Sequence, residues 1–277
     1  MSSSVFAEIL KGLYENRVIP YLGPGALFDA KNKLTSQPIP ADCESLILAM
    51  NNGNPMAPKL MYEFPRAAMN VELKKGRNFV GQFLTELYGE TEWTRAAVHD
   101  WLAQWKPSYV IDVNRDTQLQ DSYVNEEHIL IVGLARTTSA DYRFKIYHFD
   151  GTDYFEISQD DVDPKLPVLF KPMGTPKPEA HYVASDADYV DYITELMGGF
   201  AIPEFLKNYR KNKQYLLIGL RLNRESERML VSDIVYGAAD HKGWFLNGNP
   251  TDKEIKFCKK MGLEIINADV EDLLAAV

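Results

Sequence analysis

Five continuous apolar runs, rather than alternating ones, most constrain what this chain can fold into. They stand at residues 18–23, 107–114, 128–136, 166–174 and 214–222. A strand with one solvent-exposed face alternates apolar and polar residues, whereas a strand covered on both faces is apolar throughout. Segments with helical periodicity separate most of these runs. The pattern therefore predicts a Rossmann-like, doubly wound α/β fold around a mostly parallel sheet.

Two inserted segments interrupt this pattern. From about 30 to 105 the chain is mostly helical, with stretches such as "ESLILAM" and "GRNFVGQFLTELYG". From about 137 to 165, "FKIYHFDGTDYFEIS" is typical of a β-hairpin around Asp-Gly-Thr-Asp. We find no internal repeat and no low-complexity linker, so we expect a single domain over residues 1–277 that carries a helical and a hairpin insertion.

Composition excludes several classes of function. The net charge of −9 leaves no basic excess to neutralise phosphates, which disfavours a general nucleic-acid or anionic-membrane binder. Cys43 and Cys258 lie far apart without paired spacing, so we expect neither a zinc site nor a disulfide framework. No apolar run approaches the roughly 18 residues of a membrane span. We expect a soluble, cytoplasmic protein without a metal, and leave a homo-oligomer or a protein partner open.

The histidines and acidic clusters give no metal-binding pattern. His99 and His128 show no paired ligand spacing and are expected on a helix surface and at the start of a strand. The carboxylates of "SDADYVD" (185–191) fit a helix N-terminus, where the helix dipole favours negative charge.

Chemistry in such a fold is expected where the parallel strands end. Ligands of open α/β sheets bind in the crevice outside the carboxyl ends of the strands. Distinctive residues follow four of the predicted strands here: Gly23-Pro24-Gly25, Asn114-Arg115-Asp116, Met173-Gly174, and Gly219 through Asn223.

The Gly-Pro-Gly turn has two interpretations. Backbone amides in a glycine-rich turn can approach a pyrophosphate closely, but a plain turn has the same composition. The stretch is neither a P-loop nor a full GxGxxG, since Phe28 stands where the third glycine belongs. Pro24 also removes one amide donor.

In series, these strand ends resemble the sirtuin-like family, most closely its zinc-less bacterial branch, which includes NAD hydrolases. "YLGPGAL" (21–27) resembles the family's first glycine turn, and "YVIDVNRD" (109–116) its strand ending in Asn. "VLFKPMGTP" (168–176) resembles the Lys-x-His-Gly segment, with "HYVASDADYVDYI" (181–193) the helix downstream. "YLLIGLRLNRESERML" (215–230) resembles the late strand ending Gly-x-Ser, and "GLEIINADVEDLL" (262–274) the terminal strand and helix. The resemblance covers about residues 18–277.

The resemblance implies roles for individual residues. Asn114 would lie by the nicotinamide ribose and position the attacking water, with Asp116 shaping that pocket. The cofactor-binding set that it implies comprises Gly23, Gly25, Ala26, Asn114, Gly174, Gly219 and Arg221, with Gly23 and Gly25 at the pyrophosphate and Gly219 at the adenosine half. Cleavage of the nicotinamide–ribose bond passes through an oxocarbenium-like state, for which an amide supplies positioning rather than acid.

The sequence departs from the family at the general base. Met173 stands where the family has its catalytic His, and a thioether cannot accept a proton at working pH. His148, in "YHFDG", is a candidate substitute, although it lies on the predicted hairpin. Arg221 replaces the small Ser of Gly-x-Ser, where it could pair with a phosphate or block the adenosine site.

We therefore expect a protein that binds NAD or a related ADP-ribose nucleotide, with weak or no cleavage of the nicotinamide–ribose bond. Whether it is an enzyme is left open. One alternative is a non-enzymatic scaffold or interaction protein with a closed ancestral pocket. Another is an active NAD glycohydrolase that uses a different base. A conventional dehydrogenase is disfavoured, because no acidic residue follows a GxGxxG at the expected distance.

Overall fold

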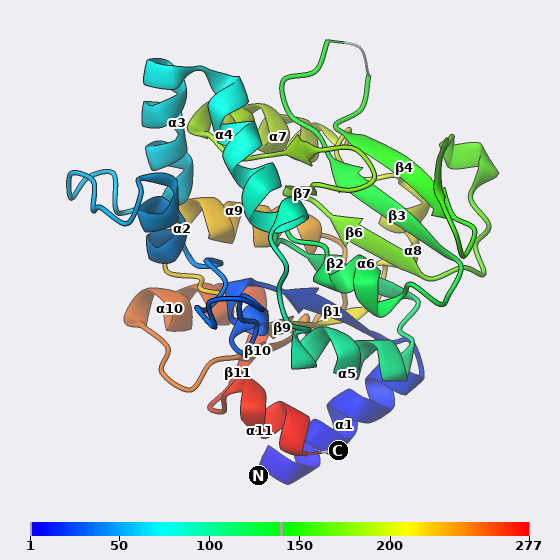
Figure 1. The fold of residues 1–277 in the computed structure, drawn as a ribbon. Coiled ribbons are helices and arrows are strands. Elements are labelled where there is room, and N and C mark those ends of the chain that lie inside the picture. Colours follow the sequence, from blue (N-terminus) through cyan, green and yellow to red (C-terminus); the bar gives the residue numbers. More distant parts are fainter. Residues whose placement is uncertain (1, 139–140, 277) are drawn as a thin grey trace.

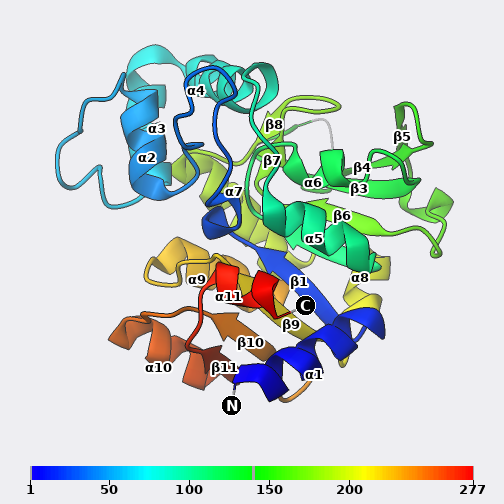
Figure 2. The ribbon, with the colours of Figure 1, turned by 60° about the horizontal axis from the view of Figure 1, so that its bottom comes forward.

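The computed structural model describes residues 2–138 and 141–276, and a central sheet organises them (Figures 1 and 2). Within these residues the sheet has nine strands in the order β11-β10-β9-β1-β2-β6-β3-β4-β5. Every neighbouring pair from β11 to β3 is parallel, and only β3-β4 and β4-β5 are antiparallel. This confirms the mostly parallel α/β sheet that the apolar runs predict.

The strands of this sheet are β1 (Val18–Leu22), β2 (Tyr109–Asp112), β3 (His128–Gly133), β4 (Phe144–Phe149), β5 (Tyr154–Ile157), β6 (Val168–Lys171), β9 (Gln214–Ile218), β10 (Gly243–Leu246) and β11 (Leu263–Ile266). A separate two-stranded sheet pairs β7 (Gly174–Thr175) with β8 (His181–Tyr182). The helices are α1 (Ser2–Tyr14), α2 (Cys43–Met50), α3 (Phe64–Lys75), α4 (Arg77–Thr85), α5 (Ala97–Trp105), α6 (Gln118–Ser122), α7 (Asp186–Gly198), α8 (Glu204–Tyr209), α9 (Glu225–Ile234), α10 (Asp252–Met261) and α11 (Val270–Ala275). Short helical turns are η1 (Pro24–Leu27), η2 (Glu86–Glu90) and η3 (Gln159–Asp161).

Both faces of the sheet are covered around its central strands, which is why β1, β2, β3, β6 and β9 are mostly apolar. On one face α7, α8 and α9 pack against Ile19 and Tyr21 of β1 and their neighbours on other strands. On the other face α1, α5 and α11 pack against Val18 and Leu22 of the same strand. Figure 2 shows α1, α5 and α11 lying along one side of the sheet. Alternate residues of β1 therefore contribute to two separate cores.

The helical insertion has a core of its own. Apolar residues of α2, α3, α4 and η2 pack together in a cluster that runs from Leu27 to Ala96, with Ala184 added. Helix α5 lies within the expected insertion range, 30–105, but packs on the sheet. In the expected hairpin range, 137–165, β4 and β5 extend the sheet at its edge, beside β3. None of the described helices is long and apolar enough to cross a membrane.

The strand order changes direction at β1, because later strands are added on both sides of it. From β1 the chain proceeds to β2 on one side, and it later returns to place β9, β10 and β11 on the other. The carboxyl ends of β1 and β9 therefore mark the switch point, where a crevice opens in doubly wound sheets. Gly23 and Gly219 directly follow these two strands.

Candidate functional site

A cavity lies at the carboxyl ends of β1, β2, β6 and β9, beneath the helical insertion. Tyr21, Asn114, Met173 and Leu220 line it from the sheet side, and further walls come from α9 and from residues of the insertion. This space, the inner cavity, measures about 80 Å³. An adjoining outer hollow of about 530 Å³ shares Pro24, Ala41, Cys43, Arg224 and Glu227 with it and extends past Gly25 and Arg221.

The Gly-Pro-Gly turn is packed against the end of β9. The Gly23 amide donates to the Ile218 carbonyl at 2.9 Å, and the Gly25 amide donates to the Gly219 carbonyl at 2.7 Å. The Ala26 amide donates to the Gly23 carbonyl at 2.9 Å. These three amides are therefore engaged within the protein, so a pyrophosphate could use them only after the turn rearranges.

Close backbone contact gives the glycines of both turns a structural role. A Cβ on Gly25 would lie 2.8 Å from the Cα of Gly219. Gly219 has a φ of +67°, and a Cβ there would lie 2.3 Å from the Ala26 amide nitrogen. Because contacts this short do not occur with a real Cβ, glycine is required at both positions whether or not a nucleotide binds.

Asn114 is held so that one atom remains for a ligand. Its Nδ2 donates to the Gly23 carbonyl at 2.9 Å and to Oδ1 of Asp112 at 2.8 Å. Its backbone amide donates to the same Asp112 oxygen at 2.9 Å. Both amide protons are thus used, and the side-chain oxygen is left to accept a hydrogen bond in the cavity that Asn114 lines.

A buried ion pair fixes Asp112 in turn. The Lys171 ammonium lies 2.7 Å from Oδ2 of Asp112, and both side chains are fully buried. Nε2 of His99 lies 3.3 Å from the same oxygen. Burial raises the pKa of Asp112, but the charge of Lys171 and the contact with His99 outweigh it and hold that pKa well below its usual range. The expectation that His99 lies on a helix surface is wrong, because its ring is completely buried.

Asp116 is buried and is not among the residues that line the cavity. Its Oδ1 accepts from the Gln118 amide at 2.7 Å, while Oδ2 is buried without a partner in the described structure. Asp116, Asp112 and His99 bring potential ligand atoms within 4.8 Å of one another. The Lys171 ammonium already supplies positive charge at Asp112, so we assign no metal to this cluster.

Met173, Gly174 and His148 are placed differently from one another. Met173 is buried and lines the cavity. Gly174 has a φ of +89°, and a Cβ there would collide with the His181 carbonyl across the small β7-β8 sheet. His148 lies on β4 with Nε2 2.7 Å from a carboxylate oxygen of Glu127, and it is not among the residues that line the cavity.

The structure therefore separates the sequence-predicted residues into three groups. Asn114 and Met173 line the inner cavity, and Gly25 and Arg221 line the outer hollow. A third group lines neither space and comprises Gly23, Ala26, Asp116, His148, Gly174 and Gly219.

Sequence reasoning missed polar residues that come from helix starts and loops. Arg115 is buried, donates to the Val183 carbonyl at 3.1 Å from Nε and 2.6 Å from Nη2, and lies over the Phe64 ring. Glu63, whose Oε1 is 3.3 Å from the Ser226 hydroxyl, also lines the cavity. Arg115 belongs to the strand-end segment Asn114-Arg115-Asp116 that the sequence singles out, although no role was predicted for it.

Glu227, on the first turn of α9, lines both spaces. Its Oε2 is shielded from solvent and has no hydrogen-bond partner in the described structure. Burial raises the pKa of this carboxyl to about 8, although the nearby Arg224 opposes the shift. A helix-start Glu carries no sequence signal of this kind, because only its packing decides whether it is buried.

Comparison with known proteins supports the strand-end pattern. Residues 108–266, more than half of the chain, match the family described as SIR2-like domain. The match runs from the start of β2 to the end of β11 and contains Asn114, Met173 and Gly219, whereas β1 and its glycine turn precede it. A comparison with curated proteins gave no match.

Proposed function

Because the chain belongs to the SIR2-like domain family, we propose that its cavity binds NAD or a related ADP-ribose nucleotide with weak or no cleavage of the nicotinamide–ribose bond. The observation that carries the proposal is that Asn114 and Met173 line one cavity at the switch point of the sheet. We place the protein in a zinc-less branch of the family, with Met173 at the position of the usual His.

The polar groups in the cavity fit the sugar part of such a nucleotide. Asn114 offers a fixed acceptor for a ribose hydroxyl or a water. Tyr21 and Glu227 each offer a buried oxygen that has no partner among the residues that the structure describes. Arg221 and Arg224, which line the outer hollow, would lie toward the phosphates. The bound nucleotide would supply a positively charged nicotinamide that leaves as a neutral pyridine.

Titration with NAD and with ADP-ribose tests the binding part of this proposal. We expect dissociation constants between micromolar and millimolar and a rise in melting temperature that grows with ligand concentration. Asn114→Ala removes the acceptor and should weaken binding of both nucleotides. The matched control is His148→Ala, which alters a residue outside the cavity and should leave binding unchanged.

Met173→His tests the catalytic part. The wild-type protein should release little nicotinamide from NAD, because loss of a general base typically costs about 10²–10⁴-fold in rate. Met173→His should raise the release rate, and Asn114→Ala in that background should remove the gain. Met173→Leu, which keeps an apolar side chain of similar size, should behave as the wild type. Rapid release by the wild type would contradict the proposal and indicate an active hydrolase with another base.

A closed pocket that serves a non-enzymatic interaction protein is the second candidate. The small inner cavity and the engaged amides of Gly23 and Gly25 favour it. This candidate is supported if calorimetry detects no binding heat and the melting temperature does not change at millimolar NAD and ADP-ribose.

A further inference from the structure

Two residues that line the same cavity each have a buried oxygen atom without a hydrogen-bond partner in the described structure. The Tyr21 hydroxyl comes from β1, and Oε2 of Glu227 comes from α9. An unsatisfied buried polar group costs about 1–3 kcal/mol, and most such groups in native proteins have a partner. A pair of these groups at one cavity therefore points to polar atoms that arrive with a ligand.

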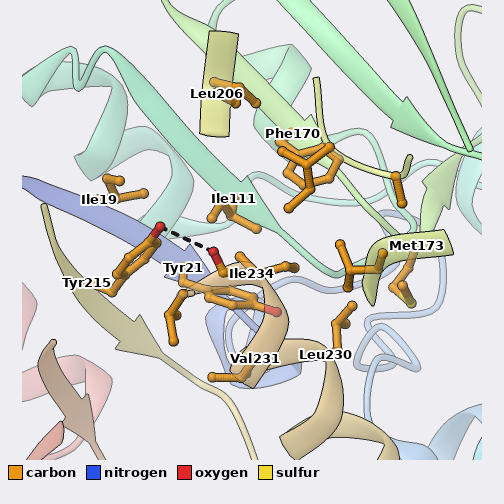
Figure 3. Packing of buried hydrophobic residues seen from close by; sticks show 14 of the residues in the cluster. Ile19, Tyr21, Ile111, Phe170, Met173, Leu206, Tyr215, Leu230, Val231 and Ile234 are labelled. Atoms are coloured by element: carbon orange, nitrogen blue, oxygen red, sulfur yellow. Dashed lines mark hydrogen bonds between the residues drawn. The ribbon is translucent and has the colours of Figure 1, made fainter. Parts of the chain in front are cut away.

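The neighbouring Tyr215 provides a comparison, because its buried hydroxyl does have a hydrogen-bond partner. Tyr21 and Tyr215 lie against α9 on the same face of adjacent strands (Figure 3). The Tyr215 hydroxyl donates to the Ile234 carbonyl at 3.4 Å, whereas the Tyr21 hydroxyl has no partner in the described structure. Of the two, only Tyr21 lines the cavity.

Charged and hydrogen-bonding groups from several elements surround Glu227 at the inner cavity. Glu63 faces it from the start of α3 and Glu254 from α10, and both carboxyls raise its pKa, while Arg224 lowers it. The Tyr189 and Tyr21 hydroxyls are further electrostatic neighbours, from α7 and β1. Arg115 and Arg224 also line the inner cavity, so its charged groups have both signs. The carboxyls of Glu63 and Glu227 and the tyrosine hydroxyls can each form hydrogen bonds with neutral hydroxyls.

The remaining walls suit the carbon atoms of a sugar. Val113, Leu230 and Val231 line the cavity beside the two oxygens. Apolar walls with a few placed polar groups are the usual construction of a small-molecule site.

We propose that Tyr21 and Glu227 form a hydroxyl-binding pair that holds the terminal ribose of the nucleotide in the inner cavity. This inference rests on the proposed function and adds residues and a preference to it: ligands that end in a free or nicotinamide-bearing ribose, such as ADP-ribose and NAD, bind more tightly than ADP. The phosphates then lie toward Arg221 and Arg224 in the outer hollow.

Tyr21→Phe tests the pair by removing a single oxygen atom. We expect the affinity for ADP-ribose to fall about 10-fold in calorimetry, the loss of one hydrogen bond to the ligand, while the affinity for ADP is unchanged. The melting temperature of the free protein should not fall, because the hydroxyl has no partner to lose. Tyr215→Phe is the matched control: it should lower the melting temperature and leave the ADP-ribose affinity unchanged.

Glu227 is tested with two substitutions at pH 7. Glu227→Leu removes the polar atoms and should weaken ADP-ribose by about 10-fold or more without weakening ADP. Glu227→Gln keeps a neutral hydrogen-bonding group and should retain more of the ADP-ribose affinity than Glu227→Leu.

The outcomes separate this inference from the function on which it rests. If Tyr21→Phe binds ADP-ribose as the wild type does, or if the variants lose ADP-ribose and ADP equally, the hydroxyl-binding pair is wrong while nucleotide binding stands. If the wild type binds neither nucleotide, the proposed function and the pair fail together.

Discussion

Two carboxyl groups at the edges of the same cavity region have opposite environments. Asp112, at the end of β2, is surrounded by Lys171, His99 and the Asn114 amide. Glu227, at the start of α9, has an oxygen with no partner in the described structure and two further carboxyls nearby. The pKa of Asp112 is lowered, and that of Glu227 is raised to about 8.

The difference shows that burial by itself does not decide the charge of a carboxyl. Desolvation raises the pKa of both groups, and only the partners differ. Asp112 is a fixed anion whose oxygens are used to hold Asn114. Glu227 can change its protonation near neutral pH and has an oxygen left for a ligand. The region around Asp112 is held by paired charges, whereas the region around Glu227 is the one that we propose to bind a ligand.

The largest expected effect comes from breaking the Asp112–Lys171 pair. Asp112→Asn leaves the Lys171 ammonium buried beside a neutral amide, which should lower the free energy of unfolding by about 3–5 kcal/mol. Urea denaturation followed by circular dichroism measures this loss. If the variant folds, nucleotide affinity should fall as well, because Asn114 loses its anchor.

A double variant sharpens the result. Asp112→Leu with Lys171→Met replaces both charges by apolar groups and should cost less than the sum of the two single changes. Strict additivity would contradict the view that the two side chains form one coupled unit.

The raised pKa of Glu227 predicts a smaller effect, a dependence of the free energy of unfolding on pH. Its pKa in the folded protein, about 8, lies above the 4.5 of an unperturbed Glu, so the native state holds the proton more tightly than the unfolded chain. The stabilisation is complete below the unfolded pKa and is lost as pH rises toward 8. Between pH 6 and pH 9 the free energy of unfolding should fall by on the order of 2 kcal/mol on this account.

The measurement is denaturation across that pH range for the wild type and Glu227→Gln. The variant cannot ionise at this position, so its stability should depend less on pH. Parallel curves for the two proteins would show that Glu227 titrates normally and that the contrast with Asp112 is absent.

The smallest effect is expected at the His148–Glu127 contact on the sheet edge. Glu127 is mostly exposed, and exposed pairs contribute about 0–1 kcal/mol. His148→Ala should therefore change the melting temperature little and leave any residual nicotinamide release from NAD unaltered. A loss of measurable release in a nicotinamide assay would show that His148 acts on the substrate after all.

The sequence by itself determined the architecture of this protein. Strands covered on both faces are expected to be apolar throughout, so the runs at 107–114, 166–174 and 214–222 predicted a parallel sheet without knowledge of their partners. The carboxyl ends of those strands then fixed where Asn114 and Met173 would lie, because parallel strands end at one edge of the sheet.

Only the tertiary structure decided what the individual groups near those ends do. The glycines of "YLGPGAL" fit a phosphate-binding turn or a tightly packed turn equally well. The contact between Gly25 and Gly219, nearly two hundred residues apart, shows that the turn is tightly packed. The pKa values of Asp112 and Glu227 likewise depend on neighbours from distant elements. Lys171 lies beside Asp112, whereas other carboxyls lie near Glu227. Local sequence encodes periodicity and propensity, but a pKa or an unpaired atom is set by three-dimensional neighbours, which the local pattern does not specify.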